Sequence, residues 1–123
     1  MINSYNLIEK KEGGYIMTRG TTPTLTLSID NADLSTLKNM YITFSQETRK
    51  LTKVYQAGSD NNQIEIDIEN SEVAVSLTQD ETLKFKPGPV DIQVRYTNNA
   101  DSAYATNIVR IDMGRILQEG VIE

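Results

Sequence analysis

The chain contains no cysteine, no histidine and no tryptophan. The absence of cysteine excludes disulfides, thiolate nucleophiles and thiolate metal ligands. The absence of histidine excludes the Ser–His–acid and Cys–His arrangements of nucleophilic catalysis. No glycine-rich phosphate-binding loop is present either. The sequence therefore predicts a protein that is not an enzyme and that carries no cofactor.

Basic residues are also scarce: 12 Lys and Arg stand against 17 Asp and Glu, which gives a net charge of −5. A nucleic-acid partner requires a basic footprint, and an anionic membrane surface attracts basic segments. The first residues lack the basic and apolar regions of a signal peptide, and no apolar run is long enough to cross a bilayer. We therefore expect neither nucleic acid nor membrane as a partner.

Apolar residues make up only 38% of the 123 residues, but they alternate regularly with polar ones. A period of two is typical of half-buried antiparallel strands. Clusters of Asp, Asn, Gly and Pro separate the alternating segments, as turns do. The pattern predicts an all-β, immunoglobulin-like antiparallel β-sandwich of about seven strands. The expected strands are 22–29, 39–46, 51–56, 63–68, 72–77, 90–97 and 104–113.

Two short helical turns are expected between the strands. Thr78 and Glu81 have the spacing of a capping box, in which each side chain bonds the backbone amide of the other residue. Asp33 can cap a second turn over residues 34–37. We divide the chain into an N-terminal arm or lead-in (1–16), a sandwich domain (17–114) and an apolar C-terminal tail (115–123).

The best candidates for an interface lie at the ends of the predicted domain. Arg19 and Arg115 each neighbour a single glycine at an element boundary, and arginine is enriched at protein interfaces. Large apolar residues on a terminal tail either fold back onto the domain or dock on a neighbouring subunit. The apolar interface candidates are Ile116, Leu117, Val121 and Ile122.

A second candidate surface is aromatic. The alternation predicts that Tyr41, Tyr55 and Tyr104 face outward, where exposed tyrosines can form a ligand-binding face for sugars or proteins. Singly exposed aromatic residues are also common on surfaces that bind nothing.

Carboxylates offer little chemistry. Glu65, Asp67 and Glu69 alternate with isoleucines, so they belong to a solvated strand face. Several loop aspartates could hold Ca²⁺ through oxygen atoms, but none has EF-hand spacing, and Asp favours turns for its own local hydrogen bonds. We therefore predict no metal site. The loop aspartates are Asp30, Asp33, Asp60 and Asp101.

Five blocks follow one another from residue 19 to the C-terminal region: RGTTPT (19–24), MYITFSQ (40–46), LTQDETLKF (77–85), VDIQVR (90–95) and GRILQEGVI (114–122). This succession resembles small tail- and baseplate-associated proteins of phages and prophages of Gram-positive bacteria. In architecture it is similar to the immunoglobulin-like N-terminal modules of baseplate proteins. The family pattern begins near the RGTT run, so residues 1–16 are an additional lead-in.

The resemblance implies a non-enzymatic structural component of a tail or baseplate that acts through subunit contacts. It implies other tail or baseplate proteins and further copies of the chain as partners, synthesis in the bacterial host cytoplasm and a final place in the virion. One alternative is a carbohydrate or cell-surface binding module that uses the tyrosines. Another is a small bacterial enzyme or regulator, which the absence of histidine, cysteine and nucleotide loops disfavours.

Overall fold

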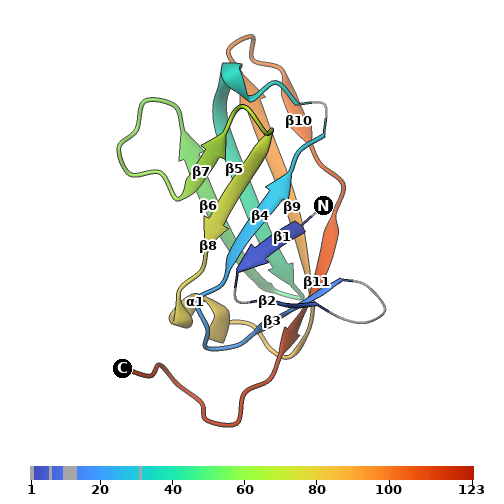
Figure 1. Cartoon of the computed structure of the whole chain (residues 1–123), viewed down its shortest axis with the longest axis vertical. Coiled ribbons are helices and arrows are strands. Elements are labelled where there is room, and N and C mark those ends of the chain that lie inside the picture. The colour runs from blue at the N-terminus through green and yellow to red at the C-terminus, as the bar shows by residue number, and fades with distance from the viewer. Residues whose placement is uncertain (1, 6, 10–13, 31) are drawn as a thin grey trace.

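The computed structural model describes residues 2–5, 7–9, 14–30 and 32–123. Two β-sheets pack face to face around one core (Figure 1). The smaller sheet has the strand order β1-β4-β8-β7, with β1 (Ile2–Tyr5), β4 (Thr24–Ser28), β8 (Glu72–Ser76) and β7 (Ile64–Asp67). The larger sheet has the order β2-β3-β11-β9-β5-β6, with β10 paired to β9. Its strands are β2 (Leu7–Glu9), β3 (Tyr15–Thr18), β11 (Val109–Gly114), β9 (Gly88–Asn98), β5 (Leu37–Gln46), β6 (Arg49–Gln56) and β10 (Ala103–Ala105).

The topology is that of an immunoglobulin-like sandwich. In that fold, strands A, B, E and D form one sheet and C, F and G form the other. Here β1, β4, β8 and β7 take the places of A, B, E and D, while β5, β9 and β11 take those of C, F and G. The prediction of an all-β sandwich is therefore confirmed. One pair departs from the antiparallel rule, because β3 runs parallel to β11.

The described part of the chain contains eleven strands rather than about seven. Three short strands, β1, β2 and β3, lie within residues 2–18, which overlap the predicted arm (1–16) and the first two residues of the predicted sandwich domain. The fourth comes from the final predicted strand, which is interrupted between β10 and β11. There, the Thr106 hydroxyl replaces a backbone carbonyl and accepts the Val94 amide at 3.1 Å. The Thr106 carbonyl accepts a bond from the Gln93 side chain at 3.0 Å, so the ladder is irregular at this point.

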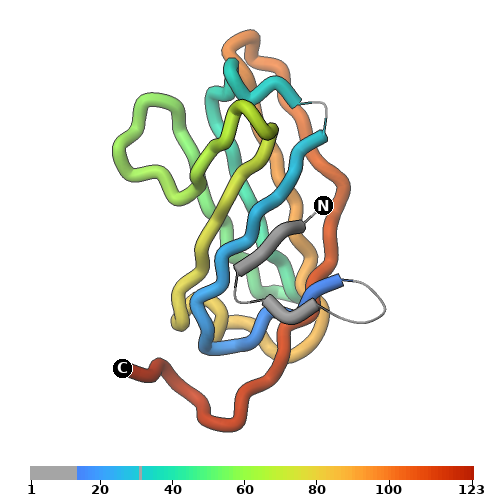
Figure 2. The backbone as a smooth tube through the Cα atoms, viewed as in Figure 1, coloured from blue at the N-terminus to red at the C-terminus, as the bar shows by residue number. Residues whose placement is uncertain are grey.

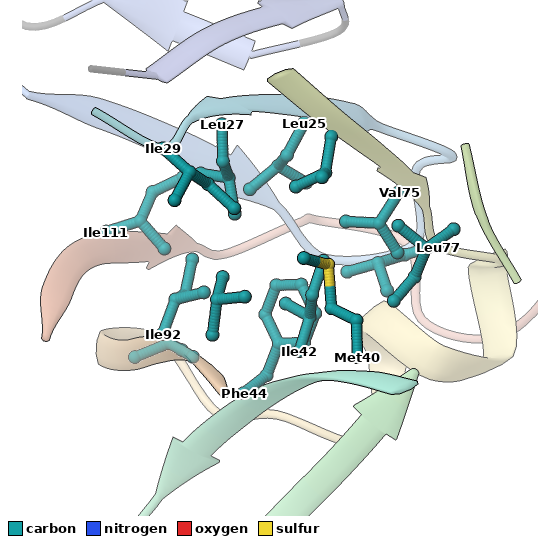
Figure 3. Packing of buried hydrophobic residues seen from close by; sticks show 14 of the residues in the cluster. Leu25, Leu27, Ile29, Met40, Ile42, Phe44, Val75, Leu77, Ile92 and Ile111 are labelled. Carbon is teal, nitrogen blue, oxygen red and sulfur yellow. The ribbon is translucent and has the colours of Figure 1, made fainter. Parts of the chain in front are cut away.

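The core lies between the sheets, where alternate residues of facing strands point inward (Figure 3). Met40, Ile42 and Phe44 on β5 are completely buried, and Leu25 and Val75 cover them from the smaller sheet. Burying one such side chain stabilises the fold by about 1.5–3 kcal/mol. The apolar residues of the period-two pattern therefore stabilise the fold by being buried between the two sheets.

One of the two predicted domain boundaries coincides with the end of a strand, and the other lies inside a strand. Gly114 ends β11, which coincides with the predicted end of the sandwich. The boundary between residues 16 and 17 lies inside β3, and β1 pairs with β4. Residues 10–13 of the predicted arm lie outside the described residues, and the three-part division stays a prediction. In the described part of the chain, no helix is long and apolar enough to cross a membrane.

Candidate functional site at the tail end of the sandwich

One end of the sandwich carries α1 (Gln79–Leu83), and the C-terminal tail passes beneath it (Figures 1 and 2). The capping box that begins this helix is present as predicted. The Thr78 hydroxyl accepts the Glu81 amide at 3.2 Å, and the Glu81 carboxylate accepts the Thr78 amide at 2.9 Å. Buried Leu77 and Phe85 flank the helix and anchor it to the core. The predicted cap at Asp33 is also present, on the 3₁₀ helix η1 (Leu34–Thr36) at the other end.

A buried ion pair joins α1 to the larger sheet. The Lys53 ammonium lies 2.7 Å from the Glu81 carboxylate, and their side chains are only 8% and 17% exposed. Burial by itself raises the pKa of Glu81. The hydrogen bonds from Lys53 and Thr78, together with the positive charge of Lys53, outweigh burial and lower that pKa. Glu81 therefore both caps the helix and balances a charge inside the protein.

The ion pair depends on the orientation of β6, where one prediction was wrong. Met40 and Ile42 on β5 are opposite Tyr55 and Lys53, so the two β6 side chains share the inner face. Tyr55 is partly buried against the core and does not face outward as expected. Both alternating sets of β6 contain polar and apolar residues, so the hydrophobic pattern there does not identify the buried face.

Arg19 fastens three segments together. Its Nε donates to the Phe85 carbonyl at 2.7 Å and its Nη2 to the Leu83 carbonyl at 3.2 Å. These carbonyls lie at the end of α1, where helical acceptors lack partners. Its Nη1 lies 2.7 Å from both carboxylate oxygens of Glu119 in the tail. The Arg19 side chain is only 15% exposed, so its primary contacts lie within the chain.

The parallel pairing of β3 with β11 places Arg19 beside Gly114 and Arg115. The Arg19 amide donates to the Gly114 carbonyl at 3.0 Å. Gly20 follows with φ +75°, and a Cβ there would lie 3.1 Å from Ile116. Glycine is favoured at such a φ because it has no side chain. Arg19–Gly20 and Gly114–Arg115 thus meet in space, whereas the Arg115 side chain itself is exposed.

The tail is held down by polar contacts and presents apolar side chains to solvent. Gln79 exchanges two hydrogen bonds with the Ile122 backbone, at 2.9 and 3.0 Å. Ile116 is partly buried beside Gly20, whereas Leu117, Val121 and Ile122 are 95%, 51% and 62% exposed. The tail therefore folds back while most of its apolar surface remains available. Glu119 and Gln79 were missed from the sequence, because no local pattern marks their distant partners.

The other candidate residues lie elsewhere. Tyr41 and Tyr104 are 44% and 47% exposed, and both line a small hollow of about 90 Å³ with Arg95 on the larger sheet. Tyr104 also stacks on Tyr96. Tyr55 does not contribute to this hollow.

The carboxylates that the sequence analysis considered lie at exposed positions. Glu65 and Asp67 are exposed, as expected of a solvated strand face. Hydrogen bonds from Ser35 lower the pKa of Asp33, and the bond from Lys38 lowers that of Asp101. Among the described residues, no three Asp or Glu gather as ligands for a metal ion.

No protein-family model and no curated protein matches the chain.

Proposed function

We propose that this chain is a non-enzymatic structural component of a phage or prophage tail or baseplate. It acts through contacts with other tail or baseplate proteins and with further copies of itself, and its place is in the virion. The observation that carries the proposal is the C-terminal segment of this chain (115–123). Its Leu117, Val121 and Ile122 side chains are exposed, while its backbone is held against the sandwich. The resemblance of the five sequence blocks supplies the biological setting.

The tail is well suited to serve as a contact element. Arg19 and Gln79 hold its backbone near α1, so fewer conformations are lost when a partner binds. An anchor that is already positioned binds more tightly than a free segment with the same side chains. Arg115 is exposed next to these apolar residues, and a polar rim around an apolar centre is the usual composition of an interface.

The expected strength of this anchor can be estimated. Scaling about 1.5–3 kcal/mol for a fully buried side chain by the exposed fractions gives roughly 4 kcal/mol for the three residues. Association costs about 4–15 kcal/mol in lost freedom of motion. The tail alone therefore does not hold two subunits together. It acts as one anchor of a larger contact or of a multivalent ring.

Purified particles provide the test. A tagged chain is expressed during prophage induction, and the particles are purified and analysed by mass spectrometry. We expect the wild-type chain in several copies per particle and much less of the Leu117→Asp variant. Ile68→Asp is the matched control, because Ile68 is 55% exposed and lies just beyond β7, away from the tail. Absence of the wild-type chain from purified particles contradicts the proposal.

A further inference from the structure

A groove lies between residues 28–37 and the β10–β11 segment. The end of the sandwich that carries β10 is opposite the end that carries α1 and the C-terminal tail (Figure 1). The volume of the groove is about 740 Å³, within the usual range of about 300–1,000 Å³ for small-molecule sites. It opens between the end of β4 and the β10–β11 segment. Ser28 at the end of β4 and Ile29 just beyond it line one side, and Tyr96, Tyr104 and Val109 of the large sheet line the other.

Two tyrosines form an aromatic wall. The Tyr96 and Tyr104 rings stack with centroids 5.1 Å apart and an interplanar angle of 25°. Tyr96 packs against the core, and Tyr104 is 47% exposed. Burial, and to a smaller extent the neighbouring Tyr104, raises the pKa of Tyr96, so its hydroxyl stays protonated. A rigid aromatic platform of this kind offers a flat apolar surface with hydroxyl groups at its edge.

The polar lining supplies both donors and acceptors. Asp30 offers carboxylate oxygens, Thr36 a hydroxyl, and Asn98 and Asn107 side-chain amides. The Asn98 amide oxygen already accepts the backbone amides of Ala100 and Ser102, which leaves its nitrogen to donate to a ligand. Of the lining residues that the structure describes, none is Lys or Arg, whereas Asp30 and Asp33 are acidic. This lining disfavours phosphates, sulfates and carboxylates, which bind where cations or charged donors gather.

An added peptide strand fits this groove less well. Strand addition requires a regular row of unpaired backbone groups along a sheet edge. The β10–β11 edge is broken at Thr106, whose hydroxyl donates to the Asn107 carbonyl and whose own carbonyl accepts from Gln93. The groove therefore offers side-chain chemistry rather than a backbone ladder.

We propose that this groove binds a neutral saccharide, with one sugar ring against Tyr104 and its hydroxyls bonded to Asp30, Asn98 and Asn107. Sugars carry an apolar ring face and alternating hydroxyl donors and acceptors, which match the aromatic wall and the mixed polar lining. The site is separate from the tail. Sugar binding can therefore be tested independently of any role in assembly.

The experiment begins with the full chain on an array of neutral, sialylated, sulfated and phosphorylated glycans. A neutral oligosaccharide that binds is then titrated in solution by NMR. We expect binding confined to neutral glycans, with resonance changes around the groove. Tyr104→Ala should weaken it about tenfold through loss of the platform, whereas Tyr104→Phe keeps the ring and should retain most of the affinity. Asp30→Asn is nearly the same shape, lies at an exposed position and should weaken binding several-fold.

Tyr41→Ala is the matched control. Tyr41 is similarly exposed and lines the neighbouring small hollow but not the groove. Unchanged glycan affinity of this variant supports the groove as the binding site. An equal loss of affinity in Tyr41→Ala and Tyr104→Ala overturns the proposal and points to the small hollow instead. Preference for anionic glycans, binding of random hexapeptides without any glycan, or no glycan binding at all each overturns the proposal.

Discussion

Replacement of Lys53 by methionine tests whether the buried ion pair holds α1 against the sandwich. Methionine keeps most of the apolar stem but leaves the Glu81 carboxylate, which is only 17% exposed, without its cation. Removing one partner of a fully buried pair costs about 3–5 kcal/mol. Because Glu81 keeps the Thr78 amide and some contact with water, we expect the free energy of unfolding to fall by about 2–3 kcal/mol.

Urea unfolding followed by far-UV circular dichroism measures this change. With a slope of about 1.5 kcal/mol/M, the urea midpoint at pH 7 should fall by roughly 1.3–2 M. Lys38→Met is the matched control, because the Lys38–Asp101 pair is exposed on both sides. Pairs of that kind contribute little, so the control should not shift measurably.

The pH dependence separates charge from packing. The folded pKa of Glu81 lies below its unfolded value of about 4.5, so the folded state gives up its proton more readily. The stability contributed by Glu81 is therefore present above the unfolded pKa and lost as pH falls through the folded pKa. In Lys53→Met, burial still raises the pKa of Glu81, but Lys53 no longer lowers it. The difference in the free energy of unfolding between wild type and Lys53→Met should therefore become smaller as the pH falls.

A second substitution provides the refuting result. Adding Glu81→Gln to Lys53→Met removes the uncompensated charge while keeping the capping-box geometry, which accepts Gln as well as Glu. The double variant should be more stable at pH 7 than Lys53→Met alone. If it is not, or if Lys53→Met has no effect on unfolding, the ion pair does not hold the helix as argued.

Two further substitutions probe the same end of the molecule. Gly20→Ala should lower the free energy of unfolding by about 1–3 kcal/mol, because of its φ of +75° and a Cβ 3.1 Å from Ile116. Gly58 has φ +83° and open space around it, so Gly58→Ala measures the cost of the backbone conformation alone. Equal urea midpoints for the two variants would argue against crowding of the Gly20 position by the tail. Thr78→Ala removes the hydroxyl that accepts the Glu81 amide and should cost about 1 kcal/mol in thermal unfolding. An unchanged melting temperature would mean that the cap contributes nothing.

The parts of this fold that were predictable are those set by short-range patterns. The alternation along β5 identified the buried set Met40, Ile42 and Phe44, because a period of two places them on one face. The capping box at Thr78 and the cap at Asp33 were found for the same reason, since cap and partner lie within three residues.

The parts that were not predictable depend on contacts between distant residues. Arg19 meets Glu119 across 100 positions, and Lys53 meets Glu81 across 28. No local rule connects such pairs, and the mixed composition of β6 concealed that Lys53 and Tyr55 face inward. The groove likewise depends on the pairing of β10 with β9, which stacks Tyr104 on Tyr96.

The most direct test of the central claim, that the tail makes subunit contacts, is sedimentation velocity of the full chain. Concentrations from about 10 μM to about 1 mM detect net association free energies of about 4–7 kcal/mol, which the whole subunit contact must supply with the tail as one of its anchors. The account predicts that the mass rises with concentration, that Leu117→Asp abolishes the rise, and that Ile68→Asp preserves it. Two results contradict self-association through the tail. One is a wild-type chain that stays monomeric at every concentration, and the other is a Leu117→Asp variant that associates as strongly as the wild type.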